Sequence, residues 1–165
     1  MPRSLIGFAD RVMFENALAR RATVMLDPSR FADAVMNLLT NAREATEAAG
    51  RRDPIVLRLR GAERTTVAAD SDADATLAVE VIDRGLGIDP ETLSRIFEPG
   101  FSTKRLNVTQ RVRGLGMMSL RLFVEEAGGS VRVQSALGQG RTVTLLLPAQ
   151  HVRGEAALVG SATAE

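Results

Sequence analysis

The chain has 165 residues, 45% of them hydrophobic and 25% charged, with a formal net charge of +1 at pH 7. This length and composition predict one globular domain with a sizeable core and exclude a disordered chain, and the near-zero charge gives no bulk electrostatic reason to bind nucleic acid or a membrane. The absence of Cys excludes disulfides and thiol chemistry, and no apolar run approaches the roughly 20 residues of a membrane helix.

The first part of the chain predicts a helix, a short strand and a second, longer helix. Residues 4–20 carry loosely spaced apolar side chains that fit a helical period, and Arg21–Leu26 fits a strand. Asp27 marks a helix start, because an Asp side chain caps exposed backbone N–H groups. We therefore expect a helix over residues 29–49. The side chains expected on its core face are Phe31, Ala34, Val35, Leu38, Ala42 and Ala45.

The remainder predicts alternating strands and helices, and hence an α/β fold. Strands are expected at 55–60, 76–83, 130–135 and 141–147, and helices at 90–96 and 115–127. The polar stretches 61–75 and 98–113 are expected to be loops, the second of them mobile. Pro148 would end the last strand, so the domain is expected to cover 1–148 and a flexible tail to cover 149–165.

Two carboxamides on the long helix, Asn37 and Asn41, fall on one stripe with Glu44 at the border of the apolar face. Polar groups at such a border need partners. Water or a neighbouring loop would satisfy them. A divalent cation on bound phosphates is the functional alternative, because Mg²⁺ takes few protein oxygens.

The segment DRGLGID begins with Asp83, which shares a predicted strand face with three apolar residues, Leu77, Val79 and Val81. A carboxylate at the end of a buried strand needs a strong donor. The exocyclic amino group of adenine, helped by a water, would be one. Gly85 and Gly87 would allow a tight turn and leave room for a flat ring. The alternative is an ordinary turn, since this pattern alone is common.

A second glycine pair, Gly114 and Gly116, precedes the helix expected at 115–127. The N–H groups at a helix N-terminus hold phosphate oxygens. The loop before it carries Arg105 and Lys104, the single Lys among 21 Lys and Arg residues. Such a loop would close over a polyphosphate. The alternative is a solvated basic loop.

In this order, NLLTNAREAT, DRGLGID, IFEPGFSTK and GLGMMSL resemble the N, G1, F and G2 boxes of the GHKL ATPase superfamily, and within it the catalytic ATP-binding domain of bacterial sensor histidine kinases. GQGRTVTLLLP resembles the closing hairpin. The resemblance runs from about residue 5 to Pro148. It implies the Bergerat fold, an α/β two-layer sandwich with a mixed, mostly antiparallel sheet, helices on one face and a mobile ATP lid. It also implies ATP and Mg²⁺ as ligands.

The resemblance further implies roles for individual residues. Asn41 would bind Mg²⁺ with the help of Asn37, and Asp83 would recognise adenine. Lys104 would reach the phosphates, and it would form the catalytic set together with the two Asn residues. The other residues expected to contact the nucleotide are Arg43, Gly85, Gly87, Ile88, Phe97 at the hinge of the lid, Arg105, Gly114, Leu115, Gly116, Met117 and, at the back of the base pocket, Thr142.

Some positions depart from the family pattern. Gly100 stands where such kinases usually carry a large apolar residue, and Glu44 stands where many carry Lys, which leaves Arg43 or Lys104 as the basic phosphate partner. Superfamily members that hydrolyse ATP carry a Glu general base at the position of Asn37. Because an amide does not accept that proton, the resemblance implies transfer of the γ-phosphoryl group to a protein rather than rapid hydrolysis.

The acceptor of this transfer is not evident in the chain. The single His, His151, has no acidic residue beside it, and no dimerisation hairpin precedes the domain. We expect an excised domain or stand-alone module that phosphorylates a His on a separate phosphoacceptor/dimerisation domain, with a response regulator downstream. We expect it in the cytoplasm, where a parent kinase would be free or membrane-anchored. Two alternatives stay open: a stand-alone GHKL protein kinase of the anti-sigma type, and a non-catalytic ATP-binding interaction module.

Overall fold

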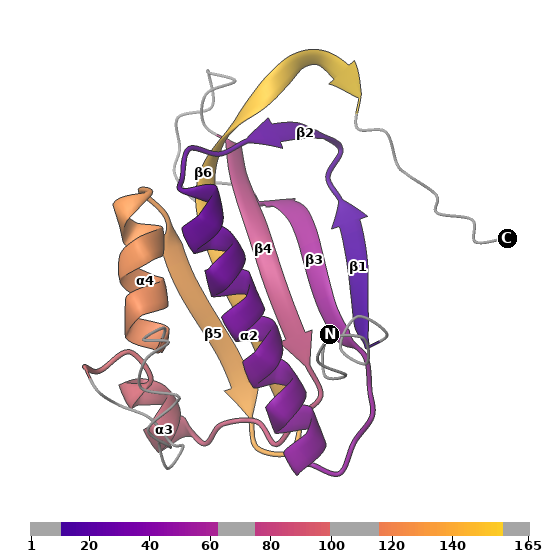
Figure 1. Ribbon diagram of the computed structural model, residues 1–165, viewed down its shortest axis with the longest axis vertical. Coiled ribbons are helices and arrows are strands. Elements are labelled where there is room, and N and C mark those ends of the chain that lie inside the picture. The colour runs from indigo at the N-terminus through magenta and orange to yellow at the C-terminus, as the bar shows by residue number, and fades with distance from the viewer. Residues whose placement is uncertain (1–10, 63–74, 100–115, 157–165) are drawn as a thin grey trace, which may run out of the picture.

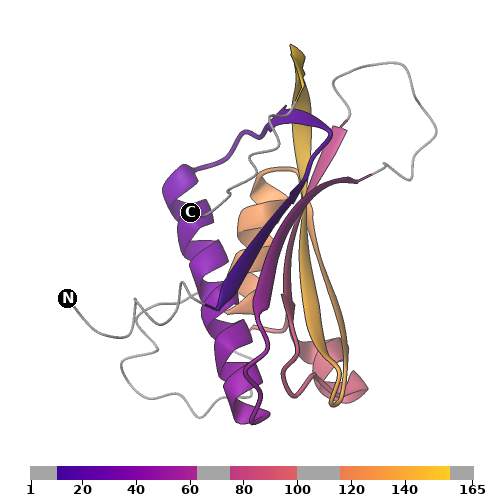
Figure 2. The same ribbon diagram turned by 90° about the vertical axis from the view of Figure 1, so that its right-hand side faces the viewer.

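The computed structural model describes residues 11–62, 75–99 and 116–156, which form a sheet with a helical layer on one face (Figures 1 and 2). The strands are β1 (Val12–Ala17), β2 (Arg20–Thr23), β3 (Ile55–Ala62), β4 (Ala75–Asp83), β5 (Ser130–Ala136) and β6 (Gly140–Ala156). The helices are α2 (Pro28–Ala48), α3 (Pro90–Arg95) and α4 (Met117–Glu126). The predicted strands and helices from residue 28 to residue 136 are thus confirmed, to within about two residues at each end, and the last predicted strand begins within one residue of the start of β6.

The sheet is mixed, with one parallel pair. β1 runs parallel to β3, and the pairs β3–β4, β4–β6, β5–β6 and β2–β6 are all antiparallel. β6 pairs with β5 through its first half, up to Leu146, and with β2 through its last part, from Gln150. This confirms the expected two-layer α/β sandwich with a mostly antiparallel sheet.

Helix α2 begins at the cap that the sequence predicts. The Asp27 carboxylate accepts hydrogen bonds from the backbone N–H groups of Ser29 at 2.9 Å and Arg30 at 3.0 Å, which satisfies donors left open by the first turn. The helix then buries one stripe against β4 and β6, and α4 packs beside it. The buried residues of the two helices are Ala34, Leu38, Leu39, Ala42 and Thr46 of α2 and Leu120, Phe123 and Val124 of α4.

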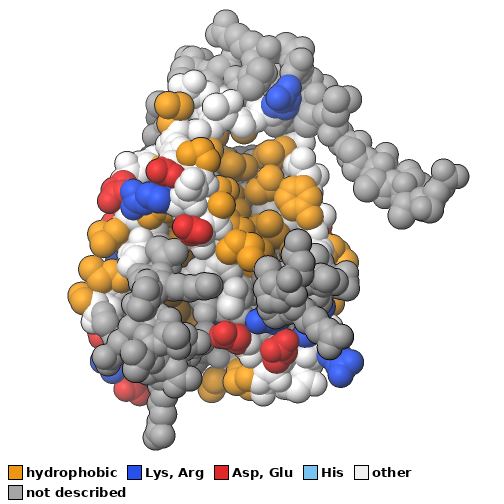
Figure 3. Space-filling view, viewed as in Figure 1, with side chains coloured by type: hydrophobic (Ala, Val, Ile, Leu, Met, Phe, Trp, Pro, Cys, Tyr) orange, Lys and Arg blue, Asp and Glu red, His pale blue; other side chains and the backbone are white. Residues whose placement is uncertain are grey.

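The two helices leave part of this face uncovered on the side of β1. Phe14 is in register with Leu57, whose other neighbour in the sheet is the buried Val81, so Phe14 lies on the helix-bearing face. Its side chain is nevertheless 59% exposed. Figure 3 shows apolar side chains gathered beside α2 on this face.

Expectations for the two ends of the chain are wrong. The helix expected over residues 4–20 is replaced by β1, by residues Leu18 and Ala19, and by the start of β2, while residues 1–10 lie outside the described part. The parallel partner β3 overrides a weak helical period, because strand preference depends on long-range neighbours. The strand expected over Arg21–Leu26 ends at Thr23.

The last strand does not end at Pro148 but continues to Ala156. Pro148 lies between the segment of β6 that pairs with β5 and the segment that pairs with β2, where a missing backbone N–H is tolerated. Residues 157–165 lie outside the described part, as do residues 63–74 and 100–113 of the loops expected at 61–75 and 98–113. The ends of the first of these loops belong to β3 and β4. Within that part, no helix is long and apolar enough to cross a membrane.

Candidate functional site

The described residues of the predicted site come from elements that meet at one end of the helical layer (Figure 1). β4 ends at Asp83 beside the C-terminal half of α2, and α4 begins at the same end. Asn37, Asn41 and Arg43 lie on α2 and are half-buried. Four predicted residues lie outside the described part of the chain: Lys104, Arg105, Gly114 and Leu115.

The Asp83 carboxylate is buried at the end of β4, as predicted, and its side chain is 1% exposed. Its Oδ1 accepts a hydrogen bond from the backbone N–H of Gly85 at 2.9 Å. Its Oδ2 accepts one from Nε of Arg141 at 2.8 Å. Arg141 lies directly opposite Asp83 on β6 and is itself 15% exposed. A charged donor therefore compensates the buried charge.

Arg141 is a residue that the sequence interpretation missed. A signal for it exists, because Arg141 alternates with Val143, Leu145 and Leu147, all of which are buried. That alternation puts Arg141 at the end of a core-facing strand, as it does Asp83. To predict that Arg141 lies opposite Asp83, one also needs the register of β4 against β6, and the alternation of apolar residues within each strand does not supply it.

Thr142 lies on the other face of the sheet. It is paired with Ile82 and Gln134, each one residue away from the rung that holds Asp83 and Arg141. Since successive side chains of a strand point to opposite faces, the expectation that Thr142 closes the pocket beside Asp83 does not fit this register. Arg141 is the side chain of β6 that adjoins the carboxylate.

The glycines of the DRGLGID segment allow close approach of protein backbone. A Cβ added to Gly85 would lie 2.6 Å from the carbonyl carbon of Ala45, and one added to Gly87 would collide with the carbonyl oxygen of Ala136. Gly87 also has a φ of +72°, which other residues rarely adopt. The space that we expected a flat ring to fill beside these Cα atoms is thus filled by α2 and by the β5–β6 turn.

Hydrogen bonds fasten the same segment on both sides. The N–H of Leu86 donates to the carbonyl of Ala45 at 3.3 Å, and the carbonyl of Leu86 accepts from Gly138 at 2.7 Å. The N–H of Ile88 donates to Oγ of Ser135 at 2.9 Å. The chain between β4 and α3 is therefore a fixed edge of the site rather than a free loop.

Asp89 ends this edge and caps α3. Its carboxylate accepts a hydrogen bond from the backbone N–H of Thr92 at 2.8 Å. Hydrogen bonds from the side chain and backbone of Thr92 hold the pKa of Asp89 below its ordinary value. The start of α3 is thus fixed relative to the end of β4.

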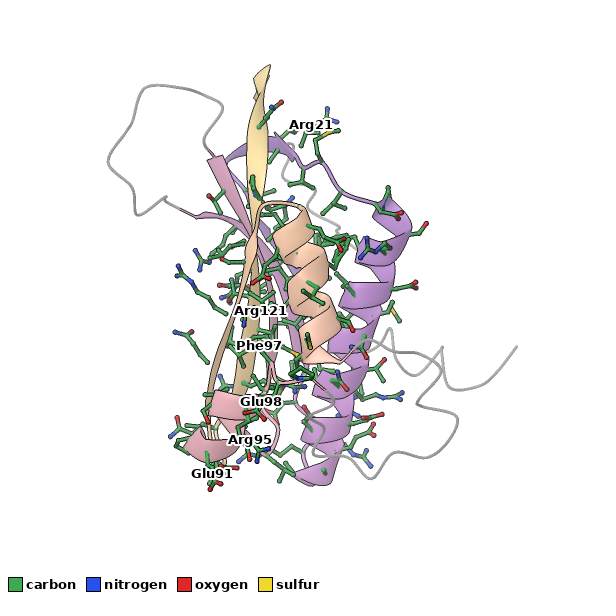
Figure 4. The ribbon with its side chains drawn as sticks, turned by 90° about the vertical axis from the view of Figure 1, so that its left-hand side faces the viewer. Arg21, Glu91, Arg95, Phe97, Glu98 and Arg121 are labelled. Carbon is green, nitrogen blue, oxygen red and sulfur yellow. The ribbon has the colours of Figure 1, made fainter. Side chains whose placement is uncertain are left out.

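Phe97 follows α3 and is half-buried. The guanidinium carbon of Arg121, on α4, lies 5.5 Å from the centre of its ring (Figure 4), a cation–π distance. Nε of Arg121 also donates to Glu125 at 2.7 Å. Phe97 therefore joins the end of α3 to α4, immediately before the segment expected to be the lid. Its role as a hinge stays a prediction.

The first turn of α4 differs from those of the other two described helices. Asp27 caps α2 and Asp89 caps α3, whereas Gly116 at the start of α4 supplies no side-chain hydrogen bond. Gly116 is exposed, and Met117 after it packs against the core. Among the described residues, the N-cap position of this turn supplies no capping side chain, an arrangement that suits an anionic ligand.

Within the described part of the chain, no group of three or more His, Cys, Asp or Glu side chains could hold a metal ion. A carboxylate-rich metal cage is therefore not found there. The carboxamides of Asn37 and Asn41 fit a different donor set, in which Mg²⁺ keeps most of its positions for water and phosphate oxygens.

Comparisons with known proteins agree with this arrangement. The family model described as "Histidine kinase-, DNA gyrase B-, and HSP90-like ATPase" matches residues 26–151. The gliding motility regulatory protein of Myxococcus xanthus is 36% identical over 141 residues, which cover 70% of this chain and 18% of that protein. Sensor histidine kinase ZraS of Salmonella typhi is 33% identical over 125 residues, which cover 76% of this chain and 23% of that protein. The chain thus spans about a fifth of the length of these relatives.

Among solved structures, the mycobacterial sensor histidine kinase MprB matches with a TM-score of 0.60 and 24% identity, covering 91% of this chain and 92% of that one. This likeness concerns the fold. The family match covers most of the chain, including Asn37, Asn41, Asp83 and Gly116. The chain belongs to the family of histidine kinase-, DNA gyrase B- and HSP90-like ATPases.

Proposed function

We propose that this chain is the catalytic ATP-binding domain of a protein histidine kinase. It binds Mg-ATP and donates the γ-phosphoryl group to a His on a separate phosphoacceptor/dimerisation domain, in two-component signalling with a response regulator downstream and in the cytoplasm. The observation that carries the proposal is the buried carboxylate of Asp83, which ends β4 at the same end of the domain as the Asn residues of α2 and the glycine-started first turn of α4. Matched relatives that are named as histidine kinases support it.

The base, the metal ion and the phosphates each have a partner in this proposal. Asp83 accepts a hydrogen bond from the amino group of adenine, since each of its oxygens keeps a lone pair after bonding Gly85 and Arg141. Asn41, assisted by Asn37, holds Mg²⁺ through carboxamide oxygens, and the bound ion would neutralise charge on the phosphates. The first turn of α4 binds phosphate oxygens.

The remaining contacts rest on the family resemblance. Lys104, Arg105, Gly114 and Leu115 are proposed as phosphate and lid residues on that ground. Arg43 is a weaker phosphate candidate, because its Nε is buried and lies 4.0 Å from the carboxylate of Glu47 on the same helix.

The type of chemistry follows from Asn37. A water molecule attacking ATP needs a base that accepts its proton, and the Asn carboxamide does not act as one. Transfer to a protein His needs no such base in this domain, because a neutral imidazole nitrogen is already a nucleophile. The domain then contributes by positioning the nucleotide and stabilising charge.

Calorimetric titration of the whole chain tests the nucleotide site. We expect the wild type to bind ADP and to bind MgATP more tightly than ATP alone. Asn41→Ala should abolish the gain from Mg²⁺ while ADP binding persists, because Asp83 and the glycines are unchanged. Asp33→Asn, an exposed change on the same helix, is the matched control and should behave as the wild type. A wild type that binds no adenine nucleotide would refute the proposal.

Incubation with labelled ATP and a supplied His-containing dimerisation domain tests the reaction. Acid-labile labelling of His is expected. Labelling of Ser instead would favour the stand-alone kinase of the anti-sigma type. Nucleotide binding with no transfer to any supplied domain would favour the non-catalytic module.

A further inference from the structure

The carboxylate that the proposed function assigns to the base is shared with a second charged side chain. Asp83 and Arg141 face each other across β4 and β6, with Nε 2.8 Å from Oδ2, and their side chains are 1% and 15% exposed. We propose that Arg141 is a further specificity-determining residue: the Asp83–Arg141 pair, rather than Asp83 alone, reads the hydrogen-bonding edge of the purine. This inference rests on the proposed function.

The backbone around Arg141 keeps its side chain beside the carboxylate. A Cβ added to Gly140 would collide with the carbonyl oxygen of Asp83, so β6 approaches β4 closely at this point. The carbonyl of Gly140 accepts a hydrogen bond from Oγ of Ser135 at 2.7 Å. Strand alternation then directs Arg141 to the face that carries α2 and α4, where the proposed base lies.

The hydrogen-bonding capacity of the pair matches two adjacent atoms of adenine. A carboxylate has about four acceptor positions and a guanidinium has five N–H donors. Gly85 occupies one position on Oδ1, and Arg141 occupies one on Oδ2 with its Nε–H. The pair therefore keeps both an acceptor and donors. Adenine offers its N6 amino group as a donor next to N1 as an acceptor. In our proposal Asp83 accepts from the amino group and Arg141 donates to N1, so that the guanidinium replaces the helper water expected from the sequence.

The ligand that tests this contact is 1-deaza-ADP, in which a C–H group replaces N1 and the amino group remains. The binding of ADP and 1-deaza-ADP to the full chain is compared by competition, without Mg²⁺, in the wild type and in Arg141→Met. Both ligands are measured on the same preparation, so the ratio of their affinities does not depend on the folded fraction. Arg132→Met is the matched control, because Arg132 is an exposed Arg of β5 in register with Thr144, on the other face.

We expect the wild type and Arg132→Met to bind 1-deaza-ADP about 10-fold more weakly than ADP, the loss that follows when a hydrogen bond to a charged group disappears. Arg141→Met should bind the two within about twofold of each other, and Arg141→Lys, which keeps a charged donor, should retain part of the preference. An equal ratio in the wild type and Arg141→Met would overturn the inference and leave the proposed function standing. Absence of ADP binding in the wild type would overturn both.

Discussion

Replacing Asp83 by Asn keeps the size of the side chain but removes the charge that compensates Arg141. The Asn carboxamide oxygen can still accept from the N–H of Gly85. Arg141 is then left as a largely buried cation, with a side chain 15% exposed. The complementary change, Arg141→Met, leaves a carboxylate that is 1% exposed and keeps, among the described residues, the hydrogen bond from Gly85. Each change creates one uncompensated charge.

The expected cost of each single change is about 3 kcal/mol of unfolding free energy, the lower end for breaking a buried pair, because Arg141 keeps some contact with water. The double variant buries neither charge, so it should lose no more than about 3 kcal/mol rather than about 6. The coupling free energy between Asp83 and Arg141 is therefore at least about 3 kcal/mol. In a chain of this length, each single change corresponds to a fall in melting temperature of roughly 6–12 °C.

Urea unfolding of the wild type, both single variants and the double variant, at pH 7 and without nucleotide, measures this coupling. Repeating it in 1 M salt should change the coupling little, since a buried pair is poorly screened. Additive losses would refute the view that Arg141 compensates Asp83. The result also governs how binding data are interpreted, because a weak signal from Asp83→Asn must first be corrected for unfolded protein.

The other predictions concern Asn37, the β5–β6 turn and Asp89. Asn37→Glu should raise ATP hydrolysis about 10-fold or more by supplying a general base, and an unchanged phosphate-release rate would count against that role. Gly140→Ala should lower the unfolding free energy measured in urea by about 3–5 kcal/mol, because its Cβ would collide with the backbone of Asp83. Gly138→Ala is the control: it has a similar positive φ but nothing within 4 Å of an added Cβ, and it should lower the unfolding free energy by about 1–2 kcal/mol. Equal losses in the two variants would contradict the steric reason. Because the pKa of Asp89 is lowered in the folded protein, its carboxylate stabilises the fold fully above the unfolded pKa of about 4 and loses that effect as the pH falls through the folded pKa. The difference in urea midpoint between the wild type and Asp89→Asn should thus be present near pH 6 and vanish near pH 2. A difference that persists at pH 2 would exclude the charge of Asp89 as its cause.

The sequence alone predicts those helices and strands whose caps and apolar patterns lie within the element itself. Helix α2 carries its cap at Asp27 and its apolar stripe within one continuous segment. β1 has no such internal signal. Its partner is β3, and the contact between Glu15 and Arg58, at 2.6 Å, joins residues 43 apart in the chain. The spacing of apolar residues within 12–17 carries no information about β3, so the sequence predicts a helix there.

The candidate site divides in the same way. Asp83 could be predicted because the three apolar residues that alternate before it identify its face. Arg141 is 58 residues away from Asp83, and only the register of β4 against β6 makes them neighbours. The same register moves Thr142 to the other face. The family pattern gave positions along the chain, while the side chain of β6 that adjoins Asp83 depended on strand pairing.

The packing of the glycines has a consequence for how such sequences diverge. Gly85, Gly87 and Gly140 have no room for a Cβ because protein backbone occupies it, so selection for folding alone would retain them. A descendant that had lost its ligand would therefore keep all three glycines. The glycine pattern alone would not mark which copies of such a domain still use nucleotide.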